Sequence, residues 1–411
     1  MTASPFDPLT IGPLRLRNRF IKSGANEAMC LDGRPTQALV KHHRDIAAGG
    51  VGMTTVAYLA VAPEGRTFAN QTWMRPEILP DLTALTSAVK AEGAAISAQL
   101  THAGSFITGM RLRGRAISAS SGFNSAGMLK GNLLQRAMSE ADMRRVTDEF
   151  VAAAKLARDA GFDAVELHMG HGYLLNQFIS PLSNKRSDAY GGSASNRIRF
   201  PAQVLAAVVE AVGNSVAVLA KINVADGVRR GASVADAIVT AQALQRAGAH
   251  MLVLSGGRNV ESTWFMFGSR LNREEISRVL RQQREWLTAL MMNLAAKREP
   301  PVEFKEMYFL EYSRQIRDAV EMPLAYLGGI KSIANARLAI EEGFECVVLA
   351  RALLHDPNLI AKFESGEVEQ SGCDNCNGCV AYIYHPGGTR CIRNPENDVQ
   401  LNQRAAGAID S

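Results

Sequence analysis

The sequence predicts a closed (β/α)8 barrel of the TIM type, and three observations support that fold class. Short apolar, β-branched segments recur along the 411 residues, and most are followed by a segment with apolar residues at i, i+3 and i+4 spacing. Strands that alternate with helices form parallel sheets, because parallel neighbours need a crossover connection. An open doubly wound sheet would satisfy the same pattern, but no GxGxxG turn follows an early strand. The closed barrel is therefore favoured.

Each predicted strand is a short apolar run. The eight runs are Phe20–Ser23, Gly52–Ala57, Ala95–Leu100, Ala164–His168, Val216–Ile222, Met251–Ser255, Leu324–Leu327 and Cys346–Leu349. Amphipathic helices are predicted among them at Ala141–Ala160, Ile198–Val212, Val234–Ala247 and Ile333–Glu342. Glycine closes these helices just before the next strand, which is a common way for a helix to end.

Two segments depart from a minimal barrel. Residues 257–306 lie between the sixth and seventh predicted strands and are far longer than the usual connection of roughly 2–6 residues. Within them Glu274–Arg298 is predicted as one helix, in an added subdomain near the rim of the site. The expected division is a barrel of residues 1–365 with this insertion, followed by a cysteine-rich extension of residues 366–411.

The composition argues against two classes of protein. Hydrophobic residues make up 47% and charged residues 21%, an ordinary globular balance. The net charge of +5 is too small to indicate a nucleic-acid-binding protein. No run reaches the roughly 18 consecutive apolar residues that span a bilayer, and the N-terminus lacks a signal-peptide pattern. A cytoplasmic protein without membrane or nucleic-acid partners is expected.

The candidate catalytic side chains follow the fourth predicted strand. Reactive groups of (β/α)8 barrels gather at the carboxyl ends of the strands, because the loops there surround one mouth. The stretch ELHMGHGYL places His168, His171 and Tyr173 within six residues. Two imidazoles could donate hydrogen bonds to a carbonyl oxygen, and a nearby phenol could deliver a proton to carbon. A metal pair, or two unrelated histidines in a polar loop, are the alternatives.

Other strand ends predict an anionic ligand. Gln99 stands at the end of the third strand and Lys221 at the end of the fifth. Because an unpaired buried cation is costly, Lys221 indicates an anionic partner such as the pyrimidine edge of a flavin. An internal salt bridge with a barrel carboxylate is the alternative interpretation.

The last two strand ends are typical of a phosphate site. Gly328 and Gly329 follow the seventh strand, and Ala350 and Arg351 follow the eighth. This pair of loops commonly binds phosphate in such barrels, since glycines admit close backbone N–H groups and an arginine can pair with the anion. Glycines after strands also occur merely as tight turns.

These residues together resemble the Old Yellow Enzyme family of FMN-dependent oxidoreductases. The resemblance runs from Phe6 to about Phe363, interrupted by residues 257–306. Its most specific stretch comprises His168-Met-Gly-His171-Gly-Tyr173, Ser180-Pro-Leu-Ser-Asn184, Arg186, Asp188, Tyr190-Gly-Gly and Asn196-Arg197.

The resemblance implies FMN as cofactor and NAD(P)H as co-substrate. It implies that His168 and His171 bind a substrate carbonyl and that Tyr173 donates a proton to the α carbon while hydride passes to the β carbon. The implied flavin contacts are Ser23, Gly24, Ala25, Gln99 and Lys221 at the ring, and Gly328, Gly329, Ala350 and Arg351 at the phosphate. Two positions depart from the family: Asn26 stands where Cys or Thr is frequent, and Lys221 where many members carry Arg.

The cysteine-rich extension predicts a metal centre. Cys373, Cys376, Cys379 and Cys391 have the spacing C-x2-C-x2-C-x11-C, and four thiolates suit a [4Fe–4S] cluster or a zinc ion. The motif is similar to that of 2,4-dienoyl-CoA reductase and trimethylamine dehydrogenase, larger relatives that continue into nucleotide-binding domains. An electron-transferring cluster in this chain, which stops at Ser411, is expected to need an external partner.

Three functions are compatible with these patterns. The first is an ene-reductase that acts on a small α,β-unsaturated carbonyl compound. The second is a flavin dehydrogenase or demethylase that passes electrons through an iron–sulfur cluster to a carrier protein. The third is a flavin-binding protein without turnover, which would leave the two histidines and the tyrosine without a shared purpose. A homo-oligomer is also expected.

Overall fold

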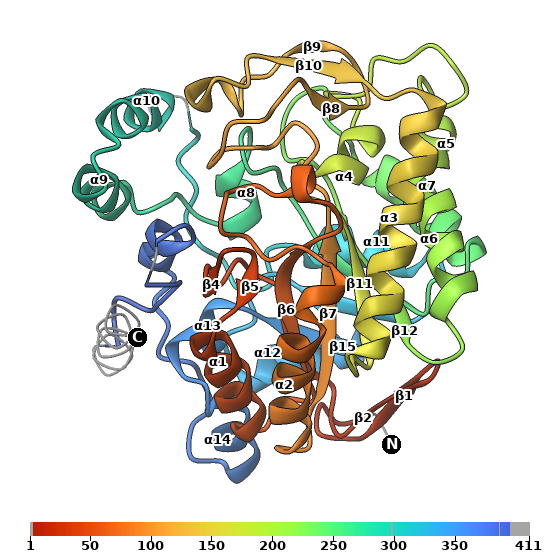
Figure 1. Cartoon of the computed structure of the whole chain (residues 1–411). Helices are drawn as coiled ribbons and strands as arrows, with labels where there is room; N and C mark the ends of the chain where they lie inside the picture. Colours follow the sequence, from red (N-terminus) through yellow and green to blue (C-terminus); the bar gives the residue numbers. More distant parts are fainter. Residues whose placement is uncertain (1–2, 297–298, 386, 395–411) are drawn as a thin grey trace.

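The eight predicted strands form one closed parallel barrel (Figure 1). They are β3 (Phe20–Lys22), β6 (Met53–Ala60), β7 (Ala95–Thr101), β11 (Ala164–Met169), β12 (Ala217–Asn223), β13 (Met251–Ser255), β14 (Leu324–Leu327) and β15 (Cys346–Leu349). Each strand pairs with the next, and β15 pairs with β3 to close the ring. The computed structural model describes residues 3–296, 299–385 and 387–394. The predicted (β/α)8 fold is confirmed.

Two apolar layers hold the barrel together. One fills the barrel interior with side chains such as Ile21, Met53 and Val253, and includes Leu16 of an N-terminal hairpin. That hairpin pairs β1 (Leu9–Ile11) with β2 (Leu14–Leu16). The larger layer lies between the strands and the surrounding helices. Side chains alternate between the two layers because successive residues of a strand point to opposite faces.

The outer helices follow the strands in order. They are α1 (Gln37–Ala48), α2 (Leu79–Lys90), α3 (Glu140–Asp159), α6 (Arg199–Val212), α7 (Val234–Arg246), α11 (Leu310–Arg317), α12 (Ile333–Glu341) and α14 (Leu359–Ser365). Three of them begin with a capping box, at Ser139, Ser233 and Ser332. In each box the serine side chain accepts a hydrogen bond from a backbone N–H of the helix. The side chain three residues on accepts one from the serine backbone N–H, so both backbone donors are satisfied.

Shorter elements build the mouth of the barrel. They are β4 (Cys30–Leu31), β5 (Arg34–Pro35), β8 (Ala116–Ser118), β9 (Gly122–Phe123), β10 (Leu134–Ala137), α4 (Leu174–Ile179), α5 (Ala194–Arg197), α8 (Thr263–Phe267) and α13 (Arg351–His355), with the 3-10 turns η1 (Pro63–Gly65), η2 (Pro76–Ile78), η3 (Met128–Lys130) and η4 (Gly378–Tyr382). No helix in the described part of the chain combines the length and apolar character that a bilayer crossing requires.

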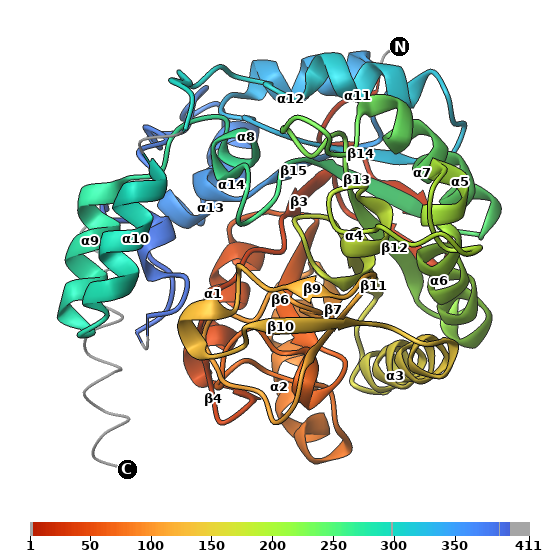
Figure 2. The same cartoon turned by 90° about the horizontal axis from the view of Figure 1, so that it is seen from above.

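The prediction of one helix over Glu274–Arg298 is wrong. The segment forms two helices, α9 (Arg273–Gln282) and α10 (Trp286–Ala296), and Arg298 lies outside the described residues. Between the two helices Arg284 has a φ of 62°, a left-handed conformation that ends a helical run. Figures 1 and 2 show the resulting hairpin projecting from the barrel beside the C-terminal segment. Apolar periodicity runs through the turn, so it cannot reveal the break.

Candidate functional site

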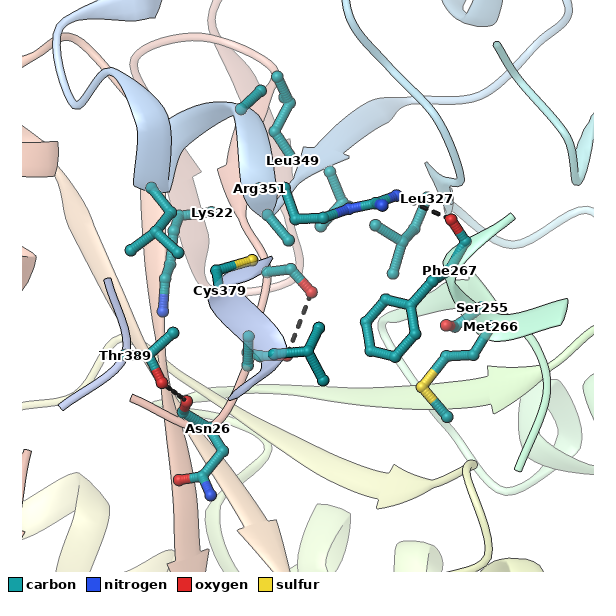
Figure 3. Close-up of a pocket in the computed structure, with 18 of the residues that line it drawn as sticks. Lys22, Asn26, Ser255, Met266, Phe267, Leu327, Leu349, Arg351, Cys379 and Thr389 are labelled. Atoms are coloured by element: carbon teal, nitrogen blue, oxygen red, sulfur yellow. Dashed lines mark hydrogen bonds between the residues drawn. The ribbon is translucent and has the colours of Figure 1, made fainter. Parts of the chain in front are cut away.

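A pocket of about 1380 Å³, counting the open space at its mouth, lies at the carboxyl ends of the barrel strands. Its walls come from the loops after β3, β14 and β15, with contributions from α8 and the cysteine-rich extension. In the view of Figure 3, Asn26, Cys379 and Thr389 lie on one side of this pocket, while Ser255, Met266 and Phe267 lie on the other. The lining therefore combines segments from both ends of the chain.

The loop after β3 forms the part of the pocket where a flavin ring was predicted. Ser23, Gly24 and Ala25 all line it. A Cβ atom on Gly24 would lie 2.7 Å from the Gln99 side-chain nitrogen, so only glycine lets the loop rest on that amide. The Gln99 Nε2 donates to Glu166 Oε1 at 2.5 Å, and Gln99 Oε1 is buried without a partner among the described residues.

Lys221 lies beneath this loop. Its Nζ is 3.1 Å from Glu166 Oε1 and donates to Ser23 Oγ and to the Gly24 carbonyl, each at 3.2 Å. Both Lys221 and Glu166 are buried. Of the two interpretations from the sequence, the salt bridge with a barrel carboxylate is therefore formed. The ammonium still contacts the loop after β3, and the Gln99 amide packs against Gly24 of the same loop.

The predicted phosphate residues do not all face the pocket. Gly329, Ala350 and Arg351 line it. Gly328 instead packs against Phe309, where a Cβ would lie 2.8 Å from the ring. The Arg351 guanidinium donates to the Phe267 carbonyl at 3.0 Å and to Asn377 Oδ1 at 2.5 Å (Figure 3 shows the first bond). These two bonds hold Arg351 across the mouth.

The two predicted histidines lie side by side at the end of β11. Their ring centroids are 5.0 Å apart, and the Tyr173 ring is 4.5 Å from that of His168. His171 Nε2 lies 2.8 Å from Ser255 Oγ. The His171 backbone has a φ of 59°, and its carbonyl accepts hydrogen bonds from the backbone and side-chain nitrogens of Asn259. These contacts orient the His171 ring.

The tautomer of His168 follows from its contacts. The Gly170 N–H donates to His168 Nδ1 at 3.4 Å, so Nε2 carries the proton of the neutral ring. That Nε2 is buried without a partner among the described residues. A buried donor of this kind costs free energy unless a ligand accepts its hydrogen bond. His168 therefore keeps a proton that it can donate, although His171 lines the pocket and His168 and Tyr173 lie buried behind it.

Burial sets the protonation of the pair and of the phenol. It holds the pKa of His168 well below its usual range and lowers that of His171 to about 3, and nearby Lys221 acts in the same direction. Burial also raises the pKa of Tyr173 well above 10, with Tyr58 adding to the effect. At neutral pH the histidines are neutral donors and Tyr173 is a protonated acid.

Tyr58, on β6, is a residue of the site that the sequence patterns did not identify. Its ring stacks on His168 at 5.7 Å, lies 5.2 Å from the Tyr173 ring, and lines the pocket. A hydrogen bond joins the two tyrosines. Only its position near the end of a strand could have suggested it. A second missed feature is the buried pair of Lys22 and Glu27, which also lines the pocket.

The four cysteines of the extension gather around one small cavity. Cys373, Cys376, Cys379 and Cys391 all line it, together with Arg351. His355, which the sequence analysis did not single out, also lines it, and its Nδ1 lies 3.4 Å from Cys391 Sγ. Burial raises the pKa of Cys379 to about 12, so a cation is needed to hold four thiolates there. The donor set fits a thiolate-bound metal, although no three His, Cys, Asp or Glu side chains among the described residues are arranged as ligands.

The extension is bonded to the loop after β3. Asn26 Nδ2 donates to the Ile383 carbonyl at 2.6 Å, and Thr389 Oγ1 donates to the Asn26 carbonyl at 2.6 Å, the bond drawn in Figure 3. The Thr389 N–H donates to the Glu27 carbonyl at 2.8 Å. Asn26, which departs from the resembled family, thus connects the two segments. The extension forms part of the pocket wall.

Comparison with known proteins identifies relatives over most of the chain. The model of the NADH:flavin oxidoreductase / NADH oxidase family matches residues 4–266. The 4,4'-dithiodibutanoate disulfide reductase of Rhodococcus erythropolis is 39% identical over 395 residues, covering 95% of each chain. The multifunctional alkene reductase/demethylase of Caballeronia cordobensis is 27% identical over 96% of this chain, which spans about half (54%) of that protein. The old yellow enzyme homologue from Zymomonas mobilis superposes with a TM-score of 0.69 at 20% identity, covering 95% of this chain and 98% of that one.

Proposed function

Because the chain belongs to the NADH:flavin oxidoreductase / NADH oxidase family, we propose that it reduces the activated double bond of an α,β-unsaturated carbonyl compound. It is an FMN-dependent oxidoreductase that uses NAD(P)H. The observation that carries the proposal is the Nε2–H of neutral His168, which has no hydrogen-bond partner in the described part of the chain and lies beside His171 and Tyr173.

The residues at the mouth fit FMN. The ring would lie over Ser23, Gly24 and Ala25, supported by Lys221 and Gln99. The phosphate would meet Gly329, Ala350 and Arg351, with Gly328 shaping the turn. Gly24 is supporting evidence, since a side chain there would collide with Gln99 and lift the loop. When bound, FMN supplies the hydride for the substrate.

The side chains of the protein would act on the carbonyl oxygen and the α carbon, whereas the hydride would go to the β carbon. The substrate carbonyl oxygen would accept hydrogen bonds from the two histidines, which stabilise the negative charge that develops on it. Neutral imidazoles can do this without losing a proton. Tyr173, whose raised pKa keeps it protonated, would donate its proton to the α carbon.

The test uses holoenzyme purified with FMN. NADPH or NADH should bleach its yellow colour and an enone should restore it. His168→Ala should weaken the binding of phenols, which place an oxygen at the same donors, about tenfold, as expected for a lost hydrogen bond of roughly 1.4 kcal/mol. His250→Ala, outside the pocket lining, is the matched control. Unchanged phenol binding in the His168 variant would refute the carbonyl-binding role.

A second candidate substrate is a disulfide. It is favoured by the relative that reduces 4,4'-dithiodibutanoate and is 39% identical over nearly its whole length. Hydride transfer to one sulfur would break the S–S bond and yield a thiol and a thiolate, and Tyr173 could protonate the thiolate. Steady-state rates with an enone and with a dicarboxylic disulfide, measured on the same preparation, decide between the two.

The cysteine cavity supports a metal centre as part of the proposal. Cys373, Cys376, Cys379 and Cys391 would hold a [4Fe–4S] cluster or zinc, and a cluster could exchange single electrons with a carrier protein. Arg351 lines both this cavity and the larger pocket at the barrel mouth, so a metal held by the cysteines would lie close to bound FMN. Iron, sulfide and zinc analysis of anaerobically purified protein distinguishes the two metals. Size-exclusion chromatography tests the expected homo-oligomer.

A further inference from the structure

We infer that Arg258 binds a carboxylate group of the substrate, in a second pocket that adjoins the histidine pair. The inference rests on the proposed function, because it assumes that the acceptor binds against His168 and His171. It goes beyond that function in defining the substrate as an anion whose carboxylate lies close to the group that is reduced.

The second pocket is polar and lies next to the reacting groups. It occupies about 620 Å³, counting the open space at its mouth, and is lined by His171 and Gly172 together with Arg258 and Glu261. Asn124 and Gln135 line it as well. His171 lines both pockets. In the binding mode that we infer, the ligand contacts His171 and its carboxylate lies in the second pocket.

Arg258 is a buried cation with unused hydrogen-bond donors. Only 5% of the residue is exposed. Its Nη1 donates to Asn176 Oδ1 at 3.0 Å, while Nε and Nη2 donate to the two oxygens of Glu261 at 3.0 and 3.4 Å. A guanidinium has five N–H groups, so within the ranges that the structure describes these three bonds leave two hydrogens for a ligand.

Glu261 is the contact that a ligand can replace. Its side chain is 38% exposed at the rim and bonds Arg258 alone among the described residues. Asn176, by contrast, is buried and also accepts a bond from the Gly172 N–H. A substrate carboxylate could take over the guanidinium edge that Glu261 occupies, while Glu261 turns into solvent. The exchange keeps the buried charge paired, which avoids the cost of an isolated cation.

Hydrogen bonds fix the position of the Arg258 backbone relative to His171. The Arg258 N–H donates to Ser262 Oγ at 2.8 Å, and the following residue, Asn259, donates twice to the His171 carbonyl, at 2.8 and 3.1 Å. Arg258 and His171 also form a β-bridge. A fixed distance between the two recognition groups would select substrates by the spacing of carboxylate and acceptor group.

The experiment uses two phenols that differ in one group. FMN-loaded protein is titrated with 4-hydroxyphenylacetate and with its neutral amide, 4-hydroxyphenylacetamide, and Kd is taken from the perturbed flavin absorption. The acid should bind about tenfold more tightly, the expected ratio for one charge-assisted contact. Arg258→Gln should abolish the preference, and Glu261→Gln, which removes the competing carboxylate, should increase it. Arg281→Gln, at an exposed arginine of α9, should leave it unchanged.

The outcomes separate this inference from the proposed function. If wild-type protein binds both phenols equally, Arg258 is not a carboxylate site and the histidine assignment stands. If it binds neither, the histidine assignment fails and this inference fails with it. A change confined to the KM for NADPH in Arg258→Gln would mark a coenzyme phosphate site and overturn the inference. If Arg258→Gln loses its FMN, the Glu261→Gln variant provides the test. An unchanged or reduced preference of that variant for the acid over the amide refutes the inference.

Discussion

Removing the charge of Glu166 should destabilise the barrel far more than removing an exposed carboxylate. Glu166 lies on β11, is 2% exposed, and pairs with Lys221, which is 1% exposed. For unit charges 3.1 Å apart, Coulomb's law with an effective dielectric constant of about 20 gives roughly 5 kcal/mol. Glu166→Gln retains a hydrogen-bond acceptor beside a buried lysine. The expected loss of unfolding free energy is therefore about 3 kcal/mol, at the lower end for breaking a buried pair.

The assay is urea unfolding of the FMN-free protein, with Glu140→Gln as the matched control. Glu140 pairs with Arg144 at 3.6 Å, but their side chains are 74% and 72% exposed, so its loss should be below about 0.5 kcal/mol. A double variant, Glu166→Leu with Lys221→Met, removes both charges and should recover most of the lost stability. Equal losses in Glu166→Gln and Glu140→Gln would refute the reasoning, because they would show that burial adds nothing to the strength of this pair.

Three further outcomes are expected. Tyr173→Phe should slow reduction of an enone by about 10²-fold or more while flavin reduction by NAD(P)H is unchanged, as stopped-flow absorbance would show; equal slowing of both steps would contradict the proton-donor role. Since burial lowers the pKa of His171 to about 3 against about 6.5 in an unfolded chain, the unfolded state binds more protons between these values. Unfolding free energy should therefore be highest above pH 6.5 and fall by up to about 1.4 kcal/mol per pH unit below it for this histidine, and a flat urea profile from pH 7 to 5 would count against burial of the neutral ring. Cys379→Ser should lower the metal content and also weaken FMN binding, because the extension is bonded to Asn26; metal loss with an unchanged FMN Kd in ultrafiltration would show that the two sites are independent.

The barrel strands could be predicted from local pattern alone. Each core strand is a run whose side chains are buried on both faces, so it appears in the sequence as a short continuous apolar segment. Met251–Ser255, Leu324–Leu327 and Cys346–Leu349 have the same bounds in the prediction and in the structure. The order of strands and helices then leaves few topologies, and reactive groups placed at strand ends follow from closure of the barrel.

The contacts among those groups depend on segments that are distant in sequence. Asn26 bonds a carbonyl 357 residues away, and Lys221 bonds Ser23 198 residues away. No periodicity encodes such pairs, which is why Tyr58 and Arg258 were not identified and why the partner of Lys221 stayed open. Local pattern determines which face of a strand or helix is apolar. The contacts among polar side chains above the barrel are decided by the tertiary structure, because closure of the strands brings loops from both ends of the chain to one mouth.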